Sequence, residues 1–269
     1  MQLIKDTTFV ALDLETTGLT PMIDRIVEIG AVKFKDGQEI DIFHKLIDPE
    51  MQICPDAFAI NGITEEMLKG KPIIDNVLPE FIEFIGNDVP IAHNATFDAV
   101  FLSYDIRRLG LNVPDIPIID TCSLPRFYFP SLNSYSLANL STDLNIKSEG
   151  LHRALADAKL CMEVFLKCID ETGCANNLTL DQIMNLDTSM LSLNTGGLLL
   201  EKPFSPLKNA LKLRKKIKIV YEDRNGLVSV RKITPLAISL FRSTVMVEAF
   251  CHMSQDERKF RLDRIVEIR

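Results

Sequence analysis

Three short acidic segments, far apart in the chain, set the strongest condition on its fold. Asp13 and Glu15 open the segment Asp-Leu-Glu-Thr-Thr-Gly, Asp98 closes His-Asn-Ala-Thr-Phe-Asp, and Asp157 closes His-Arg-Ala-Leu-Ala-Asp. Residues two apart on a strand point to the same face, so Asp13 and Glu15 would aim both carboxylates at one place. A fold that also brings Asp98 and Asp157 there assembles four carboxylates, with His152 from the third segment beside them.

Four clustered carboxylates suit hard divalent cations, because Mg²⁺ and Mn²⁺ prefer carboxylate oxygen and water as ligands. Two such ions about 3.5–4 Å apart can activate a water molecule and neutralise charge at a phosphodiester. His152 stands five positions before Asp157, at the start of a predicted helix. Since imidazole titrates near neutrality, it is a suitable general base. A single acidic residue in a turn is more often solvated or a cap, so only the combination of segments indicates catalysis.

The pattern of apolar residues predicts an α/β domain with a mixed sheet. The predicted elements are, in order, strands over 8–14, 25–35 and 39–47, a helix over 75–85, a strand over 89–92, a helix over 97–109 and a strand over 117–120. A hairpin turn over 35–38 makes the opening strands antiparallel. The later alternation of helices and strands favours parallel additions, with a ligand crevice at the carboxyl ends of the strands.

The three acidic segments resemble the motifs of the DEDDh 3′–5′ exonucleases, the group that includes the proofreading epsilon subunit of bacterial replicase. The resemblance covers roughly residues 7–172. It implies an RNase H-like fold, two bound Mg²⁺ or Mn²⁺ ions and release of nucleoside monophosphates from a 3′ end. By this resemblance His152 is the catalytic base and the metal ligands are Asp13, Glu15, Asp98 and Asp157. The residues implied to bind the substrate are Leu14, Thr16, Thr17, Gly18, Asn94 and Phe97, of which Asn94 and Phe97 would position the segment that carries Asp98.

Three further polar residues leave alternatives open. Asn61-Gly62-Ile63-Thr64 stands where many DEDDh relatives have His-Gly-Ile-Thr, which bears on the contact to the terminal nucleotide and not on the metal site. His93 follows an apolar strand, and we interpret it as a core or supporting histidine in preference to a catalytic one. Asp120 could be an additional ligand, but Asp-Thr at a helix start is more simply an N-cap.

Length and charge indicate two domains. The 269 residues, 46% of them hydrophobic, are enough for one large or two modest cores. Residues 1–203 carry 15 Lys and Arg against 30 Asp and Glu, a net charge of −15, whereas residues 204–269 carry 15 against 7, a net charge of +8. We expect an exonuclease domain over 1–173, a linker with one short helix over 174–203, and a basic β-rich domain over 204–269.

The remaining composition bounds the chemistry and the compartment. The six cysteines show no C-x-x-C pair, so neither a zinc ribbon nor a disulfide framework is indicated. No apolar run reaches 18 residues, and the N-terminus lacks a signal-peptide pattern. We therefore expect a cytoplasmic protein with reduced thiols.

The basic segment predicts a small β-rich domain. Its expected elements are a helix over 206–213 and strands over 216–221, 228–233, 245–250 and 259–262, with a tight turn at Arg224-Asn225-Gly226. The segments Ile219-Val220-Tyr221, Arg231-Lys232-Ile233-Thr234-Pro235 and Arg258-Lys259-Phe260-Arg261 resemble a WYL domain, a regulatory module with an Sm-like fold thought to sense nucleic acid or nucleotides. Val245-Met246-Val247 replaces the name-giving triplet, which removes the aromatic residues on which bases could stack.

A possible anion site survives in this domain. Arginine offers a planar, bidentate fork to phosphate. The candidate residues are Arg231, His252, Arg258, Arg261 and Arg264. Structural salt bridges are the competing interpretation for all of them.

Together, these patterns favour a metal-dependent 3′–5′ exonuclease acting on single-stranded or frayed DNA ends, with a C-terminal module that binds or senses nucleic acid. The same chemistry on RNA is an alternative, and a non-catalytic nucleic-acid sensor is another. A polymerase or repair complex is a candidate partner. Free-standing repair or processing ranks above proofreading, because the WYL-like segment stands where a polymerase-binding tail would be expected.

Overall fold

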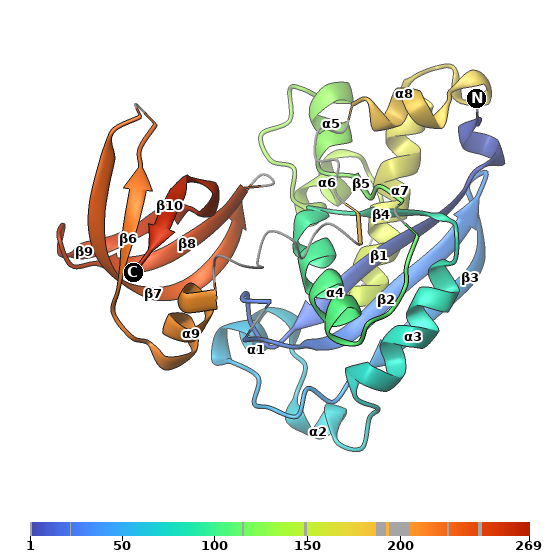
Figure 1. The fold of residues 1–269 in the computed structure, drawn as a ribbon. Coiled ribbons are helices and arrows are strands. Elements are labelled where there is room, and N and C mark those ends of the chain that lie inside the picture. Colours follow the sequence, from blue (N-terminus) through green and yellow to red (C-terminus); the bar gives the residue numbers. More distant parts are fainter. Residues whose placement is uncertain are drawn as a thin grey trace. The chain divides into compact units, whose positions relative to one another are not determined.

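The computed structural model describes residues 2–21, 23–114, 116–147, 150–186, 192–193, 205–224, 226–241 and 244–269. The chain divides into two compact units, one of Met1–Gly18 with Arg25–Gly196 and the other of Leu19–Asp24 with Gly197–Arg269. We call them the N-terminal and C-terminal units (Figure 1). Asn225 in the predicted tight turn, and much of the predicted linker, lie outside the described residues.

A five-stranded mixed sheet forms the centre of the N-terminal unit. The strands β1 (Thr8–Thr16), β2 (Ile26–Lys35) and β3 (Gln38–Leu46) are antiparallel, whereas β4 (Val89–Ala92) pairs parallel with β1 and β5 (Ile119–Asp120) pairs parallel with β4. The strand order is β3-β2-β1-β4-β5. Asp36 and Gly37 both have positive φ in the β2–β3 turn, as a tight hairpin requires. The predicted fold class is confirmed.

Several helices of the N-terminal unit were predicted from the sequence, and other short helices were not. The predicted helices correspond to α3 (Ile74–Ile85), α4 (Thr96–Arg108), α7 (Ala154–Glu171) and α8 (Leu180–Met184). The helix start predicted at Asp120 corresponds to α5 (Ser123–Tyr128). The sequence pattern does not predict α1 (Pro55–Asn61), α2 (Glu65–Leu68) and α6 (Leu137–Asp143). Each of these three is too short to show a hydrophobic period, and side-chain caps from Cys54, Thr64 and Ser136 begin them. No helix in the described parts of the chain has the length and hydropathy to cross a membrane.

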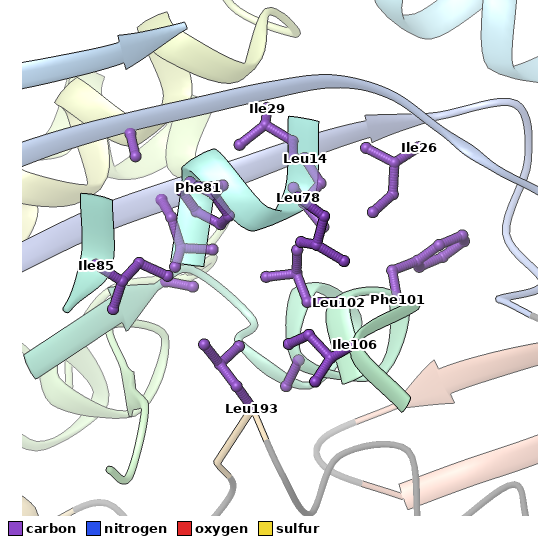
Figure 2. Close-up of a cluster of buried hydrophobic side chains, with 14 of the residues drawn as sticks. Leu14, Ile26, Ile29, Leu78, Phe81, Ile85, Phe101, Leu102, Ile106 and Leu193 are labelled. Carbon is purple, nitrogen blue, oxygen red and sulfur yellow. The ribbon is translucent and has the colours of Figure 1, made fainter. Parts of the chain in front are cut away.

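The strand β1 lies between two hydrophobic cores. Its even-numbered residues Val10, Leu12 and Leu14 pack with α3 and α4, and Figure 2 shows Leu14 among Leu78, Phe81 and Leu102. Its odd-numbered residues Phe9 and Ala11 pack with α7 on the other face. Phe9, Phe34 and Phe165 form an aromatic cluster there, with ring centroids 4.9–6.1 Å apart. Asp13 and Glu15 continue the row of Phe9 and Ala11, so strand alternation directs them to the α7 side.

A glycine allows α7 to begin directly against the sheet. Gly30 on β2 is the register partner of Asp13 on β1. A Cβ atom at Gly30 would overlap the backbone of Ala154 and Leu155 at the start of α7. Only glycine therefore permits this close approach, which places the first turn of α7 beside Asp13.

The C-terminal unit contains a five-stranded antiparallel sheet and one helix, α9 (Ser205–Leu213). The strands are β6 (Ile217–Glu222), β7 (Val228–Phe241), β8 (Thr244–Cys251), β9 (Asp256–Arg261) and β10 (Ile265–Ile268), in the order β10-β6-β7-β8-β9. The predicted helix and strands are confirmed, but β7 continues eight residues past its predicted end at Ile233. Pro235 is tolerated because the register shifts between Pro235 and Ala237, which is where proline can occur within a sheet.

Candidate active site

Three of the four predicted metal ligands lie together at the end of the α7-facing side of the sheet. Asp13 and Glu15 come from β1, and Asp157 comes from the first turn of α7. One carboxylate oxygen from each residue lies within 4.8 Å of the others. The register pairs Asp13 with Gly30 and Glu15 with Glu28, so β2 supports both positions.

Asp98 approaches this group from the opposite helix layer. It lies in the first turn of α4, is only 2% exposed, and accepts the backbone N–H of Leu14. Pairing between β1 and β4 ends at Leu12, so the Asp98 carboxylate bonds the strand just beyond that end. Asp98 is not part of the 4.8 Å group, but it is close enough to raise the pKa of Asp13.

The carboxylates fit a divalent cation because they repel one another and because two of their oxygens lack a hydrogen-bond donor in the described part of the chain. The Oδ1 atoms of Asp98 and Asp157 are buried and have no hydrogen-bond partner among the described residues. Burial, and then Asp98 and Asp157, raise the pKa of Asp13 well above its usual range. Burial raises the pKa of Glu15 to about 7, even though the Asn61 amide donates to it. A hard cation would supply both the missing bonds and the missing positive charge.

These raised pKa values predict how metal-free stability depends on pH. Since the folded state holds protons on Glu15 up to about pH 7 and the unfolded state releases them near 4.5, stability should fall as pH rises through that interval. Raised pKa values of Asp13 and Asp98 act in the same direction. We expect the protein in EDTA to melt at a higher temperature at pH 5.5 than at pH 7.5. Saturating Mn²⁺, which requires ionised carboxylates, should reverse the order.

Differential scanning calorimetry at the two pH values, with EDTA or Mn²⁺, measures this effect. Glu28 does not change this comparison. Because its pKa is lowered, its contribution to folding stability is lost only below about pH 4.5. An identical pH dependence with and without Mn²⁺ would contradict the prediction.

His152, the predicted base, immediately precedes α7. Its side chain is exposed, its φ is +63°, and its backbone N–H donates to Asp157 Oδ2 at 3.1 Å. The left-handed conformation is uncommon for a residue with a Cβ atom, so the surrounding structure holds this turn in place. That turn joins the predicted base to a predicted metal ligand through a direct hydrogen bond.

Glu28 is a site component that the sequence analysis missed. Its side chain is fully buried and accepts Arg153 Nε at 3.0 Å, Arg153 Nη2 at 2.7 Å and the backbone N–H of Ala154 at 3.1 Å. His44 Nε2 lies 2.7 Å from its Oε1. Burial alone would raise the pKa of Glu28, but these hydrogen bonds outweigh burial and lower it. The available signal was a lone acidic residue within the apolar strand Ile26–Ala31.

Asn61, where the chain departs from the DEDDh pattern, supports Glu15. Its amide donates to the Glu15 carboxylate and, at 3.4 Å, to the carbonyl of Thr16, while its Oδ1 accepts the N–H of Ile63. Asn61 is 6% exposed. Asn61 therefore connects its own segment to the end of β1 that carries Glu15.

The remaining residues with predicted substrate contacts are mostly held by the protein itself. Thr17 is fully buried, and its hydroxyl oxygen accepts the N–H of Arg25. Thr16 donates to the carbonyl of Gly18 at 2.6 Å. Leu14 belongs to the core beneath the site. The side chains at these positions therefore hold the loop after β1 in its conformation, and they are mostly buried.

Asn94 and Phe97 lie at the turn into α4. Asn94 is exposed with φ +60°, and its backbone N–H donates to Asp120 Oδ1 at 2.9 Å. Phe97 packs on the core, with its ring 4.8 Å from that of Phe101. Both positions therefore fix the segment that carries Asp98.

His93 has a structural environment, as interpreted from the sequence. Its Nε2 bonds the carbonyl of Tyr135 at 2.8 Å and its Nδ1 lies 3.0 Å from the hydroxyl of Thr121. Burial lowers the pKa of His93 to about 4, so the ring is neutral at physiological pH. Asp120 also has a structural role, but it is not the N-cap of α5, which is Cys122. It instead accepts the N–H groups of Asn94 and Cys122, because it ends β5 three residues before α5 begins.

The structure does not bring the five candidate anion-binding residues of the C-terminal unit to one face. Arg231 and Thr234 are three residues apart on β7, before its bulge, and therefore point to opposite faces. His252 bonds Thr234 at 2.8 Å, which places it opposite Arg231. Arg258 is paired with Ala249 and Arg261 with Met246, so these two arginines also alternate. Arg264 lies in a 3₁₀ turn, Leu262–Arg264.

Comparisons with known proteins match both units. A family model described as an exonuclease, RNase_T, matches residues 10–165, and a WYL domain model matches residues 203–269. DNA polymerase III PolC-type of Clostridium perfringens is 34% identical over 256 residues, covering 93% of this chain and 17% of the relative. The PolC-type polymerase of Thermotoga maritima is 45% identical over 166 residues, covering 61% of this chain and 12% of the relative. The chain thus spans about a sixth or less of these relatives.

Solved structures agree with the fold. Exonuclease X in complex with 5′ overhanging duplex DNA is 29% identical with a TM-score of 0.53, covering 66% of this chain and 98% of that one. E. coli Exonuclease I in complex with a dT13 oligonucleotide is 17% identical with a TM-score of 0.59, covering 91% of this chain and 55% of that one. The predicted resemblances to an exonuclease domain and to a WYL domain are therefore confirmed.

Proposed function

Because this chain belongs to the exonuclease family described by RNase_T and carries a WYL domain, we propose that it is a metal-dependent 3′–5′ exonuclease that releases nucleoside monophosphates from DNA. The observation that carries the proposal is the group of Asp13, Glu15 and Asp157, with unbonded carboxylate oxygens on Asp157 and the neighbouring Asp98. Such a set of oxygen donors suits a hard divalent cation, and it differs from the closed cysteine and histidine sites that hold structural metals.

Two Mg²⁺ or Mn²⁺ ions, held by Asp13, Glu15, Asp98 and Asp157, would supply an activated water and neutralise the charge on the reacting phosphate. The chain itself contributes position and proton transfer. His152 is the proposed base, since its ring is exposed beside Asp157 and can take a proton from the attacking water. The turn after β1, buttressed by Asn61, would receive the 3′-terminal nucleotide.

The proposed substrate is single-stranded DNA or a frayed DNA end. The complex of Exonuclease X with 5′ overhanging duplex DNA supports DNA, because that structure resembles this chain at 29% identity. RNA is a second candidate substrate, since a 3′-exonuclease that recognises a histone mRNA stem-loop shares the fold. A polymerase or repair complex is the partner class we propose, in view of the PolC-type relatives.

We assign the catalytic domain to residues 1–173, a linker to 174–203 and the WYL domain to 204–269. The basic charge of the last segment, +8, supports a role in binding or gauging nucleic acid. Arg231 and Arg258 on one face of its sheet, and His252 and Arg261 on the other, are candidate contacts in this proposal.

A product ladder tests the function. The full chain is incubated with Mg²⁺, Mn²⁺ or EDTA and with 5′-labelled single-stranded DNA, single-stranded RNA or duplex DNA whose labelled strand has a recessed 3′ end. We expect a descending ladder on DNA that requires metal. A ladder on RNA alone would assign the enzyme to RNA, and the absence of metal-dependent cleavage on every substrate would overturn the proposal.

A further inference from the structure

An ion pair between the buried carboxylate of Glu28 and the partly exposed Arg153 connects β2 to the start of α7. Glu28 has no exposed side-chain surface, and both of its carboxylate oxygens are bonded to Arg153, the residue between His152 and Ala154. The same carboxylate accepts the backbone N–H of Ala154, the first residue of α7. Two-point bonding by a planar guanidinium fixes orientation as well as distance.

Glu28 bonds two adjacent residues that lie between proposed catalytic residues in the sequence. One residue before Arg153 is the exposed His152, whose N–H holds Asp157. Three residues after Ala154 is Asp157 itself, 7% exposed and with its Oδ1 unbonded. On the strand side, Glu28 is the register partner of Glu15. One carboxylate thus joins the strand that supports Glu15 to the turn that carries His152 and Asp157.

We propose that Glu28 is a positioning residue of the exonuclease site, which holds Arg153 and the first amide of α7 so that His152 and Asp157 stand correctly against Asp13 and Glu15. The inference rests on the proposed function of these four residues. Glu28 contacts neither metal nor substrate in this assignment, and acts only through Arg153 and Ala154. Residues that orient metal ligands in this way typically change activity or metal affinity about 10- to 100-fold when replaced.

The competing explanation is that Glu28 and Arg153 form a salt bridge that only stabilises the fold. The charge interactions of this pair do not distinguish a positioning role from a purely structural one. Arg153 also lowers the pKa of Glu15, so loss of the pair changes charge as well as geometry. The conservative variant Glu28→Gln keeps the side-chain shape and one acceptor oxygen, but it removes the second acceptor and presents an NH₂ group to the guanidinium. Arg153→Lys keeps the positive charge and removes the fork.

Steady-state kinetics on single-stranded DNA, as a function of Mn²⁺ concentration, test the proposal. We expect Glu28→Gln to lower kcat about 10- to 100-fold and to raise the Mn²⁺ concentration for half-maximal activity, with KM for DNA changed less than about threefold. Arg153→Lys should show the same pattern more weakly.

Asp105→Asn is the matched control. Asp105 is also a buried carboxylate bonded to an arginine, with its Oδ1 2.7 Å from Arg108 Nε, but it lies two turns along α4 from Asp98. It should keep the wild-type kcat and Mn²⁺ dependence. Wild-type kcat and Mn²⁺ dependence in both Glu28→Gln and Arg153→Lys would overturn the inference while leaving the exonuclease proposal intact. An inactive wild-type enzyme would instead overturn the proposed function.

Discussion

Replacing Asp13 by asparagine is expected to abolish exonuclease activity and, at the same time, to stabilise the metal-free protein. The loss of activity should be on the order of 10⁴-fold or more, as for removal of a catalytic group, because Asp13 belongs to the acidic group and interacts electrostatically with Glu15, Asp98 and Asp157. The gain in stability follows from charge. Burial and the nearby Asp98 and Asp157 disfavour an ionised Asp13, and a neutral amide removes that repulsion. A relief of about 1 kcal/mol corresponds to about 2–4 °C in Tm.

Two measurements check this pair of effects. Product ladders from carefully purified Asp13→Asn give the residual activity, and thermal melts in EDTA give the change in Tm. Asp88→Asn is a suitable control, since it removes a carboxylate that is bonded to Lys33 at 2.7 Å outside the acidic group. It should keep activity and gain no stability. Retained cleavage in Asp13→Asn would contradict the site assignment, and a lowered Tm in EDTA would contradict the repulsion argument.

The second large effect is expected from Gly30→Ala, although residue 30 contacts no substrate. Its new methyl group would overlap the backbone of Ala154 and Leu155, so the start of α7 must move away from β2. Overpacking of this kind costs about 1–3 kcal/mol of folding stability. A displacement of about 1 Å at Asp157 and His152 can cost about 10²-fold in rate. We therefore expect a folded protein with kcat lowered about 10²-fold.

Gly110→Ala separates misplacement from simple instability. Gly110 has φ +66° and no atom within 4 Å of a built Cβ, so alanine there strains the backbone without a collision. The strain should cost about 1–2 kcal/mol of stability and leave kcat per folded molecule unchanged. Equal kcat in Gly30→Ala and Gly110→Ala, measured at a temperature where circular dichroism shows both folded, would contradict the close-packing argument.

The elements that carry Asp13, Glu15 and Asp98 could be predicted because their sequence periods are long and regular. The residues that align them could not. Glu28 interrupts an apolar strand, and sequence alone does not distinguish a buried, paired carboxylate from an exposed one. Gly30 belongs to the same run, and nothing in its neighbours indicates that a helix more than 120 residues later lies against it.

In the C-terminal unit the sequence predicted the strands but not the sheet face to which each side chain points. Its strands could be predicted from alternation, yet the five candidate anion-binding residues were grouped by residue type without regard to the strand face. The hydrogen bond between Thr234 and His252 places that histidine on the face opposite Arg231. The predicted strand ends at Ile233, whereas β7 continues through Pro235, and the register shift beside this proline explains how it can.

The position of β1 between two cores also bears on how the site can come apart. Asp13 and Glu15 sit on a strand that is packed on both faces, so they can be released only when the whole domain unfolds. Asp98 and Asp157 sit in the first turns of α4 and α7, and separate contacts hold these turns: Asp98 accepts the N–H of Leu14, and Glu28 accepts the N–H of Ala154. In the proposed site, one half of the donor set is therefore fixed by the sheet and the other half by the contacts of two helix starts. Ion affinity would then depend on those contacts, so substitutions at residues that bind no ion could tune it.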